Sequence, residues 1–78
     1  MIIKILGSGC PNCQKLESLA GQAATELGLD AKIEKVTDFA QIAAYGAMAM
    51  PALVIDDQLK LAGRLPKLEE LKNLLANA

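Results

Sequence analysis

Two cysteines three positions apart give this sequence its clearest chemical signal. They are Cys10 and Cys13, the only cysteines among 78 residues, and the chain has no histidine. Such a pair can alternate between dithiol and disulfide, because one thiolate attacks a partner's disulfide and the second thiol then releases the mixed disulfide. The same spacing provides half of a zinc or iron–sulfur site, but those sites usually take four ligands. We therefore expect redox chemistry and no metal site within the chain.

The position of the pair in the chain supports this interpretation. The apolar, β-branched run Ile2–Leu6 stops at Gly7 and predicts a buried strand. Apolar residues then recur at intervals of three and four, which predicts a helix that Gly28 can end. These residues are Cys13, Leu16, Ala20, Ala23, Ala24 and Leu27. The two cysteines therefore lie where a strand gives way to the start of a helix.

A helix start gives the two cysteines different roles. Its free N–H groups and dipole favour a thiolate at Cys10, which we expect to be the attacking sulfur. Cys13, one turn inside, is expected to be more buried and to resolve the mixed disulfide. Pro11 suits a first turn, where its missing N–H is not needed, and we expect Pro11 and Asn12 to contact the partner. The small residues 7–9 leave the approach to Cys10 open.

The middle of the chain predicts a second strand, a short helix and a hairpin. Residues 31–36 place apolar side chains among charged ones, as in a half-exposed strand. Asp38 with Gln41 resembles a capping box that starts a helix ended by Gly46. Strands over residues 52–55 and 59–62 then flank a turn at 56–58.

The last segment predicts a third helix. Pro66 is expected at its first position, followed by an acidic first turn. Its acidic residues are Glu69 and Glu70, and its inward stripe is Leu68, Leu71, Leu74 and Leu75. The order β-α-β-α-β-β-α predicts one α/β domain over residues 1–78. A crossover through the long helix should make the first two strands parallel.

The composition indicates which kinds of partner this protein binds and in which cellular compartment it works. Nine acidic and eight basic residues give a net charge of −1 with no basic run, so we expect no nucleic-acid partner. No apolar run approaches the roughly 18 residues needed to span a bilayer. The start Met1–Leu6 is interrupted by Lys4 and lacks the features of a secretory signal. We expect a cytoplasmic protein with no membrane partner, where paired cysteines serve catalysis, sensing or metal binding rather than stapling.

Four motifs together resemble the small thioredoxin-like proteins of the redox-active disulfide protein 2 type. The motifs are Gly7-x-Gly9-Cys10-x-x-Cys13, Leu27-Gly28, Met50-Pro51 before the hairpin, and Gly63-Arg64 before the last helix. The resemblance spans the chain and implies a thioredoxin-like fold, with a four-stranded mixed sheet flanked by helices. It also implies that Pro51 follows a cis peptide bond and that Met50 and Pro51 border Cys10 and bind an extended partner segment.

These features predict a thiol-disulfide oxidoreductase that reduces protein disulfides. We expect it to take electrons from a thioredoxin-reductase-like protein, to need no cofactor beyond its own disulfide, and to be a monomer. Some residues depart from familiar relatives. Lys4 replaces a buried acid, and either favours a thiolate at the site or is a solvated strand residue. Gly9 replaces an aromatic residue, and the Gly-Gly pair with which glutaredoxins bind glutathione is absent from residues 62–64, which leaves glutathione use open.

Two other functions compete with this one. A soft-metal chaperone for copper could use the same pair, but such domains place a hairpin directly after the first helix, where residues 38–45 predict a second helix. An interaction module could dock through the apolar segment 47–50, because methionine suits adaptable surfaces, although it fills cores just as readily.

Overall fold

A computed structural model describes residues 1–7 and 11–77. The elements follow the predicted order: β1 (Ile2–Leu6), α1 (Pro11–Glu26), β2 (Lys32–Val36), α2 (Phe39–Ala44), β3 (Ala52–Ile55), β4 (Gln58–Ala62) and α3 (Leu68–Ala76). The predictions for Ser8, Gly9 and Cys10 concern positions outside the described residues.

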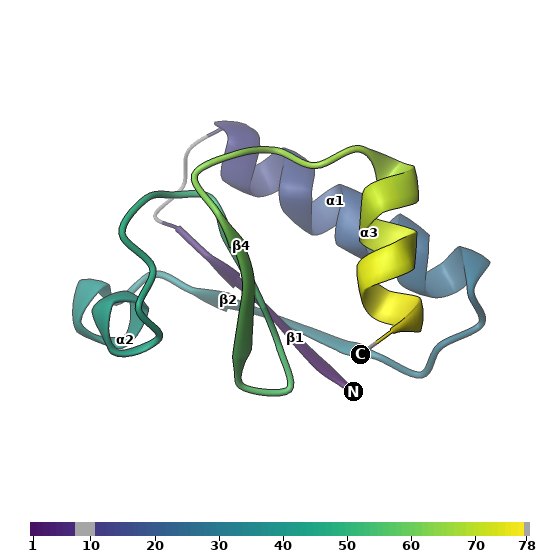
Figure 1. The fold of residues 1–78 in the computed structure, drawn as a ribbon, viewed down its shortest axis with the longest axis horizontal. Helices are drawn as coiled ribbons and strands as arrows, with labels where there is room; N and C mark the ends of the chain where they lie inside the picture. Colours follow the sequence, from purple (N-terminus) through teal and green to yellow (C-terminus); the bar gives the residue numbers. More distant parts are fainter. Residues whose placement is uncertain (8–10, 78) are drawn as a thin grey trace.

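The four strands form one mixed sheet in the order β2-β1-β3-β4. The β1–β2 pair is parallel, as the crossover through α1 predicted, and places Ile5 opposite Lys35. The other neighbouring pairs are antiparallel. In Figure 1, α1 and α3 lie together and α2 lies apart from them, and their packing below assigns them to opposite faces of the sheet.

The sheet buries a hydrophobic cluster on each face because successive strand side chains point in opposite directions. The larger cluster joins the sheet to α1 and α3, and its members include Ile3, Ile5, Leu16, Ala20, Leu53, Ile55, Leu71 and Leu75. The smaller cluster joins it to α2 through Leu6, Val36, Ile42, Ala52 and Val54. All four residues of β3 are buried, which explains its unbroken apolar run.

The ends of the first two helices follow the sequence signals. Gly28 takes φ +67° after α1, and the Leu29 N–H donates to the Ala24 carbonyl at 2.9 Å. This is the left-handed helix ending that favours glycine. Asp38 precedes α2, and its carboxylate accepts the Ala40 N–H at 2.9 Å. The helix ending at Gly28 and the helix start at Asp38 are therefore confirmed, but the Asp38 carboxylate binds the Ala40 N–H in place of the Gln41 partner of a capping box.

Two predicted boundaries were wrong. The hairpin turn is Asp56–Asp57 alone, with φ values of 48° and 66°, and Gln58 already pairs with Ile55 in β4. Two left-handed residues are enough to reverse the chain, because they match the twist of the strands. Pro66 does not begin α3. Lys67 is the extended residue before that helix, and this leaves Pro66 buried ahead of it.

Arg64, in the loop before α3, forms an ion pair with Glu70 in the first turn of that helix. Its Nη1 donates to the Glu70 Oε1 at 2.7 Å, and its Nη2 contacts the other carboxylate oxygen. The hydrogen bond with Arg64 lowers the pKa of Glu70 below its ordinary 4.5, the guanidinium charge acts in the same direction, and burial opposes both. Glu70 lies in the first turn, as predicted, where negative charge is favourable.

We expect Glu70→Gln to lower the melting temperature by about 1 to 3 °C at neutral pH, because exposed ion pairs contribute little. Glu70 has a depressed pKa, so its contribution is complete above its ordinary pKa and is lost as pH falls through the folded-state value. The difference between the two proteins should therefore shrink between neutral pH and pH 3, as followed by circular dichroism. Glu69→Gln, which removes the neighbouring carboxylate, is the matched control. A difference that stays constant down to pH 3 would contradict the assignment.

Candidate functional site

Cys13 occupies the first turn of α1, on the face that packs against the sheet. Its side chain is 5% exposed, and it is disulfide-bonded. Pro11 and Asn12, the two predicted contact residues on the same turn, are exposed. The burial expected of a resolving cysteine is therefore present, whereas its comparison with Cys10 stays a prediction.

Gly7 brings the end of β1 against Cys13. A β-carbon at Gly7 would overlap the Cys13 Sγ and lie 3.3 Å from the Cys13 Cβ. The Gly7 N–H donates to the Val36 carbonyl at 3.0 Å, so its backbone is also held by the strand beside it. Only a residue without a side chain fits between these constraints. From the sequence we expected Gly7 to leave the approach to Cys10 open, and we did not expect its contact with Cys13. A glycine at a strand end facing a helix start could have signalled this close contact.

The Met50–Pro51 segment also lies next to Gly7. The peptide bond between them is cis, which confirms what the family resemblance implied. The Met50 Cβ would be 3.9 Å from a β-carbon at Gly7, which places Met50 near Cys13. Pro51 is buried, and its carbonyl accepts the Gly63 N–H at 2.9 Å. Among the described residues, neither the N–H nor the C=O of Met50 has a hydrogen-bond partner.

A pocket of about 170 Å³ opens beside Cys13, between α1 and the β1–β2 pair. Its lining is Ile5, Gly7, Cys13, Gln14, Glu17, Lys35 and Thr37. The Glu17 carboxylate and the Lys35 ammonium form an ion pair there at 3.1 Å. No sequence motif singles out these two residues. Glu17 could have been found, because it follows Cys13 by four residues and so shares its helix face. Lys35 could not, because its place depends on the strand register.

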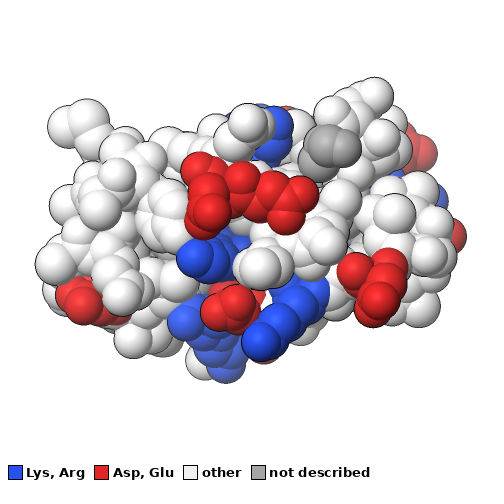
Figure 2. Space-filling model, turned by 90° about the horizontal axis from the view of Figure 1, so that it is seen from below, with Lys and Arg blue, Asp and Glu red and all other residues white. Residues whose placement is uncertain are grey.

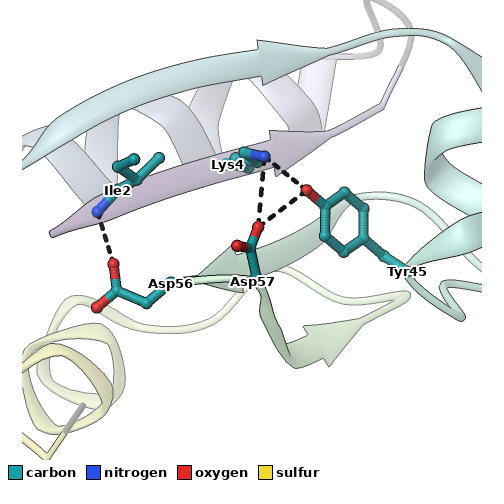
Figure 3. Close-up of polar contacts among 5 residues, drawn as sticks. All are labelled: Ile2, Lys4, Tyr45, Asp56 and Asp57. Carbon is teal, nitrogen blue, oxygen red and sulfur yellow. Dashed lines mark hydrogen bonds and ion pairs between the residues drawn. The ribbon is translucent and has the colours of Figure 1, made fainter.

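Lys4 belongs to a polar cluster on the α2 side of the sheet (Figure 3). Its ammonium donates to the Tyr45 hydroxyl at 2.6 Å and lies 3.5 Å from the Asp57 carboxylate, which also accepts from Tyr45 at 3.2 Å. The hydrogen bond with Tyr45 raises the pKa of Lys4, charge interactions with Tyr45 and Asp57 add to the rise, and burial opposes it. Neither expectation for Lys4 describes this arrangement. It is 23% exposed with fixed partners, and it is not among the residues that line the pocket beside Cys13.

Four further observations concern the described residues. On the face drawn in Figure 2, acidic and basic side chains are interspersed. Within residues 1–7 and 11–77, no cluster of three or more side chains of the kinds that bind metals is present. No helix in that part of the chain has the length and apolar character needed to cross a membrane. Met48 is 98% exposed, so it fills no core position.

Comparisons with known proteins agree with this geometry. The family model for a thioredoxin domain matches residues 1–76. The thioredoxin of Methanothermobacter thermautotrophicus is 46% identical over 76 residues, which cover 97% of this chain and 99% of that protein. The thioredoxin of Methanocaldococcus jannaschii is 39% identical, over 96% of this chain and 86% of that protein.

A solved structure supports the fold independently. The germline-specific thioredoxin Deadhead of Drosophila melanogaster superposes with a TM-score of 0.66 at 17% identity, over 97% of this chain and 78% of that one. The thioredoxin-like fold expected from the sequence is therefore confirmed. From the family match and the two archaeal relatives, this chain belongs to the thioredoxin family and is a thiol-disulfide oxidoreductase.

Proposed function

We propose that this chain reduces protein disulfides by cycling Cys10 and Cys13 between a dithiol and a disulfide. The observation that carries the proposal is a buried, disulfide-bonded Cys13 in the first turn of α1, packed against Gly7. The sequence offers one other cysteine, Cys10, three residues earlier. The proposal places this cycle in a monomeric, cytoplasmic, single-domain protein over residues 1–78.

The cycle needs no bound cofactor, because the two cysteines carry the electrons. The Cys10 thiolate attacks one sulfur of the partner's disulfide, which forms a mixed disulfide and releases the partner's other sulfur as a thiolate. The Cys13 sulfur then attacks Cys10, which forms the internal disulfide and releases the partner's second thiolate. Two electrons have passed to the partner, and its two thiolates take up protons. A thioredoxin-reductase-like protein returns two electrons and restores the dithiol.

The partner would bind across the surface beside these sulfurs. Pro11 and Asn12 are exposed at the start of α1, and Met50 is 39% exposed next to Gly7. An extended partner segment could pair with the backbone of Met50, in the manner of an added β-strand. The buried Pro51 would hold Met50, the residue that the partner segment contacts, in place. Exposed apolar surface at Met48 would extend the contact.

The copper-chaperone alternative is disfavoured by the order of elements. α2 lies between β2 and β3, so no hairpin follows the first helix directly. The match to a thioredoxin domain over residues 1–76 points in the same direction. Residues 47–50 fit better as part of the partner-binding surface than as a separate docking site. Met50 and Cys13 both lie beside Gly7, so Met50 is close to the redox site.

The test is reduction of insulin disulfides with dithiothreitol as the electron source, followed by the turbidity of the released chains. We expect catalytic amounts of the protein to shorten the lag and raise the rate well above dithiothreitol alone. The matched control is the double variant Cys10→Ser/Cys13→Ser, checked for folding by circular dichroism. Equal rates for the two proteins, or stoichiometric Cu(I) binding with no turnover, would contradict the proposal.

A further inference from the structure

The pocket beside Cys13 contains a carboxylate that the redox cycle described above does not use. Glu17 lies one helical turn after Cys13 and lines the same pocket. Among the described residues that line it, Glu17 is the one carboxylate, Lys35 the one cation and Cys13 the one cysteine. At about 170 Å³ the pocket has room for several waters, since a water occupies about 30 Å³ in the liquid. The resolving cysteine and a carboxylate thus line one small pocket.

The resolving step creates a need for such a group. Cys13 attacks as a thiolate, but burial disfavours the charged form of a thiol. Its proton must therefore pass to an acceptor as the attack begins. β1 offers none, because its ionisable residue, Lys4, is held as an ammonium by Tyr45 and Asp57. The remaining strand facing the pocket, β2, contributes Lys35, which is a cation.

We propose that Glu17 is the proton acceptor for Cys13 when Cys13 resolves the mixed disulfide. This inference rests on the proposed function. The Cys13 proton passes to the Glu17 carboxylate, directly or through a water in the pocket. The Cys13 sulfur forms its bond to the Cys10 sulfur as the bond between Cys10 and the partner breaks, and the partner leaves as a thiolate. In the reverse reaction Glu17 returns the proton to Cys13.

The ion pair with Lys35 gives Glu17 its position and its route to solvent. The 3.1 Å contact holds the carboxylate over the β1–β2 side of the pocket. Lys35 is 63% exposed and Glu17 36% exposed, so the pair lies at the mouth of the pocket. Glu17 can therefore face Cys13 and still release a proton to water.

The experiment isolates the resolving step. Reduced protein is mixed in a stopped-flow instrument with an aromatic disulfide whose released thiolate is coloured. The attack by Cys10 releases one thiolate, and the attack by Cys13 on the resulting mixed disulfide releases a second. We expect Glu17→Gln to slow the second phase by about 100-fold at neutral pH, the low end for a positioned general base, and to leave the first unchanged. The effect should fade at alkaline pH, where the buried Cys13 thiol ionises without help.

Glu26→Gln is the matched control. It removes a carboxylate from the other end of α1 that forms a similar exposed ion pair, with Lys72 at 3.3 Å. Both phases should keep their rates in that variant, and Glu17→Asp, which retains a carboxylate, should resolve faster than Glu17→Gln. The inference is overturned if the second phase of Glu17→Gln matches that of Glu26→Gln, or is slowed equally at every pH. Release of only one thiolate per molecule of the unchanged protein would instead overturn the proposed function, and this inference with it.

Discussion

Cys10→Ser should reduce insulin no faster than dithiothreitol alone, whereas Cys13→Ser should accumulate a covalent complex with its partner. A serine hydroxyl cannot replace the attacking thiolate, so the first variant never forms the mixed disulfide. The second variant forms it but has no sulfur with which to release the partner. Insulin turnover measures the loss of activity in both variants. Non-reducing electrophoresis and intact mass measure the complex, which reducing agent should dissolve.

These two variants test the division of roles between the cysteines as well as their importance. The buried side chain of Cys13 fits the resolving role, and Cys10 receives the attacking role from its place before the helix. Insulin turnover by Cys10→Ser above that of dithiothreitol alone, or a trapped complex with Cys10→Ser and none with Cys13→Ser, would contradict the assignment. Thermal unfolding of each variant under reducing conditions provides the control, because a variant that no longer folds would lose activity for another reason.

The elements of this fold could be predicted because each sequence pattern agrees with its tertiary surroundings. β3 is a continuous apolar run and is buried along its whole length. α1 repeats its apolar residues at helical spacing, and Cys13 and Leu16 are buried on that face. The turn and the start of α3 were harder, because they depend on single backbone conformations. The extended backbone of Lys67, which sets the start of α3, leaves no such pattern in the sequence.

The site was predicted only as far as its local motif extends. The cysteine spacing, together with the motif resemblance, led to Cys13 and to the Met50–Pro51 peptide. The surroundings of Cys13 require the assembled sheet. Lys35 reaches the pocket because the parallel register places it opposite Ile5, which lines the same pocket. Lys4 forms a hydrogen bond with Tyr45 and an ion pair with Asp57. These two residues come from distant segments, and no local sequence pattern indicates that they lie near Lys4.

Gly7→Ala should disable the site more than its one added methyl group suggests. The new β-carbon would overlap the Cys13 Sγ, and the Gly7 backbone cannot easily retreat because its N–H is bonded to Val36. Cys13 or the end of β1 must therefore shift. A misplacement of about 1 Å in reacting groups can cost about 100-fold in rate, and we expect that loss in the second phase of the stopped-flow assay. Overpacking at a buried contact should also cost about 1 to 3 kcal/mol in the free energy of unfolding, measured with urea.

Gly21→Ala adds the same methyl group inside α1 and is the matched control. A β-carbon there would lie 3.5 Å from the Ile33 Cδ1, an ordinary packing distance. Alanine is favoured over glycine within a helix by up to about 1 kcal/mol, so this variant should be as stable as the unchanged protein or slightly more stable, with full activity. Its retained activity would show that a methyl group on this side of the sheet is tolerated away from Cys13. If Gly7→Ala resolves its mixed disulfide as fast as Gly21→Ala, then close packing of β1 against Cys13 does not position the resolving sulfur.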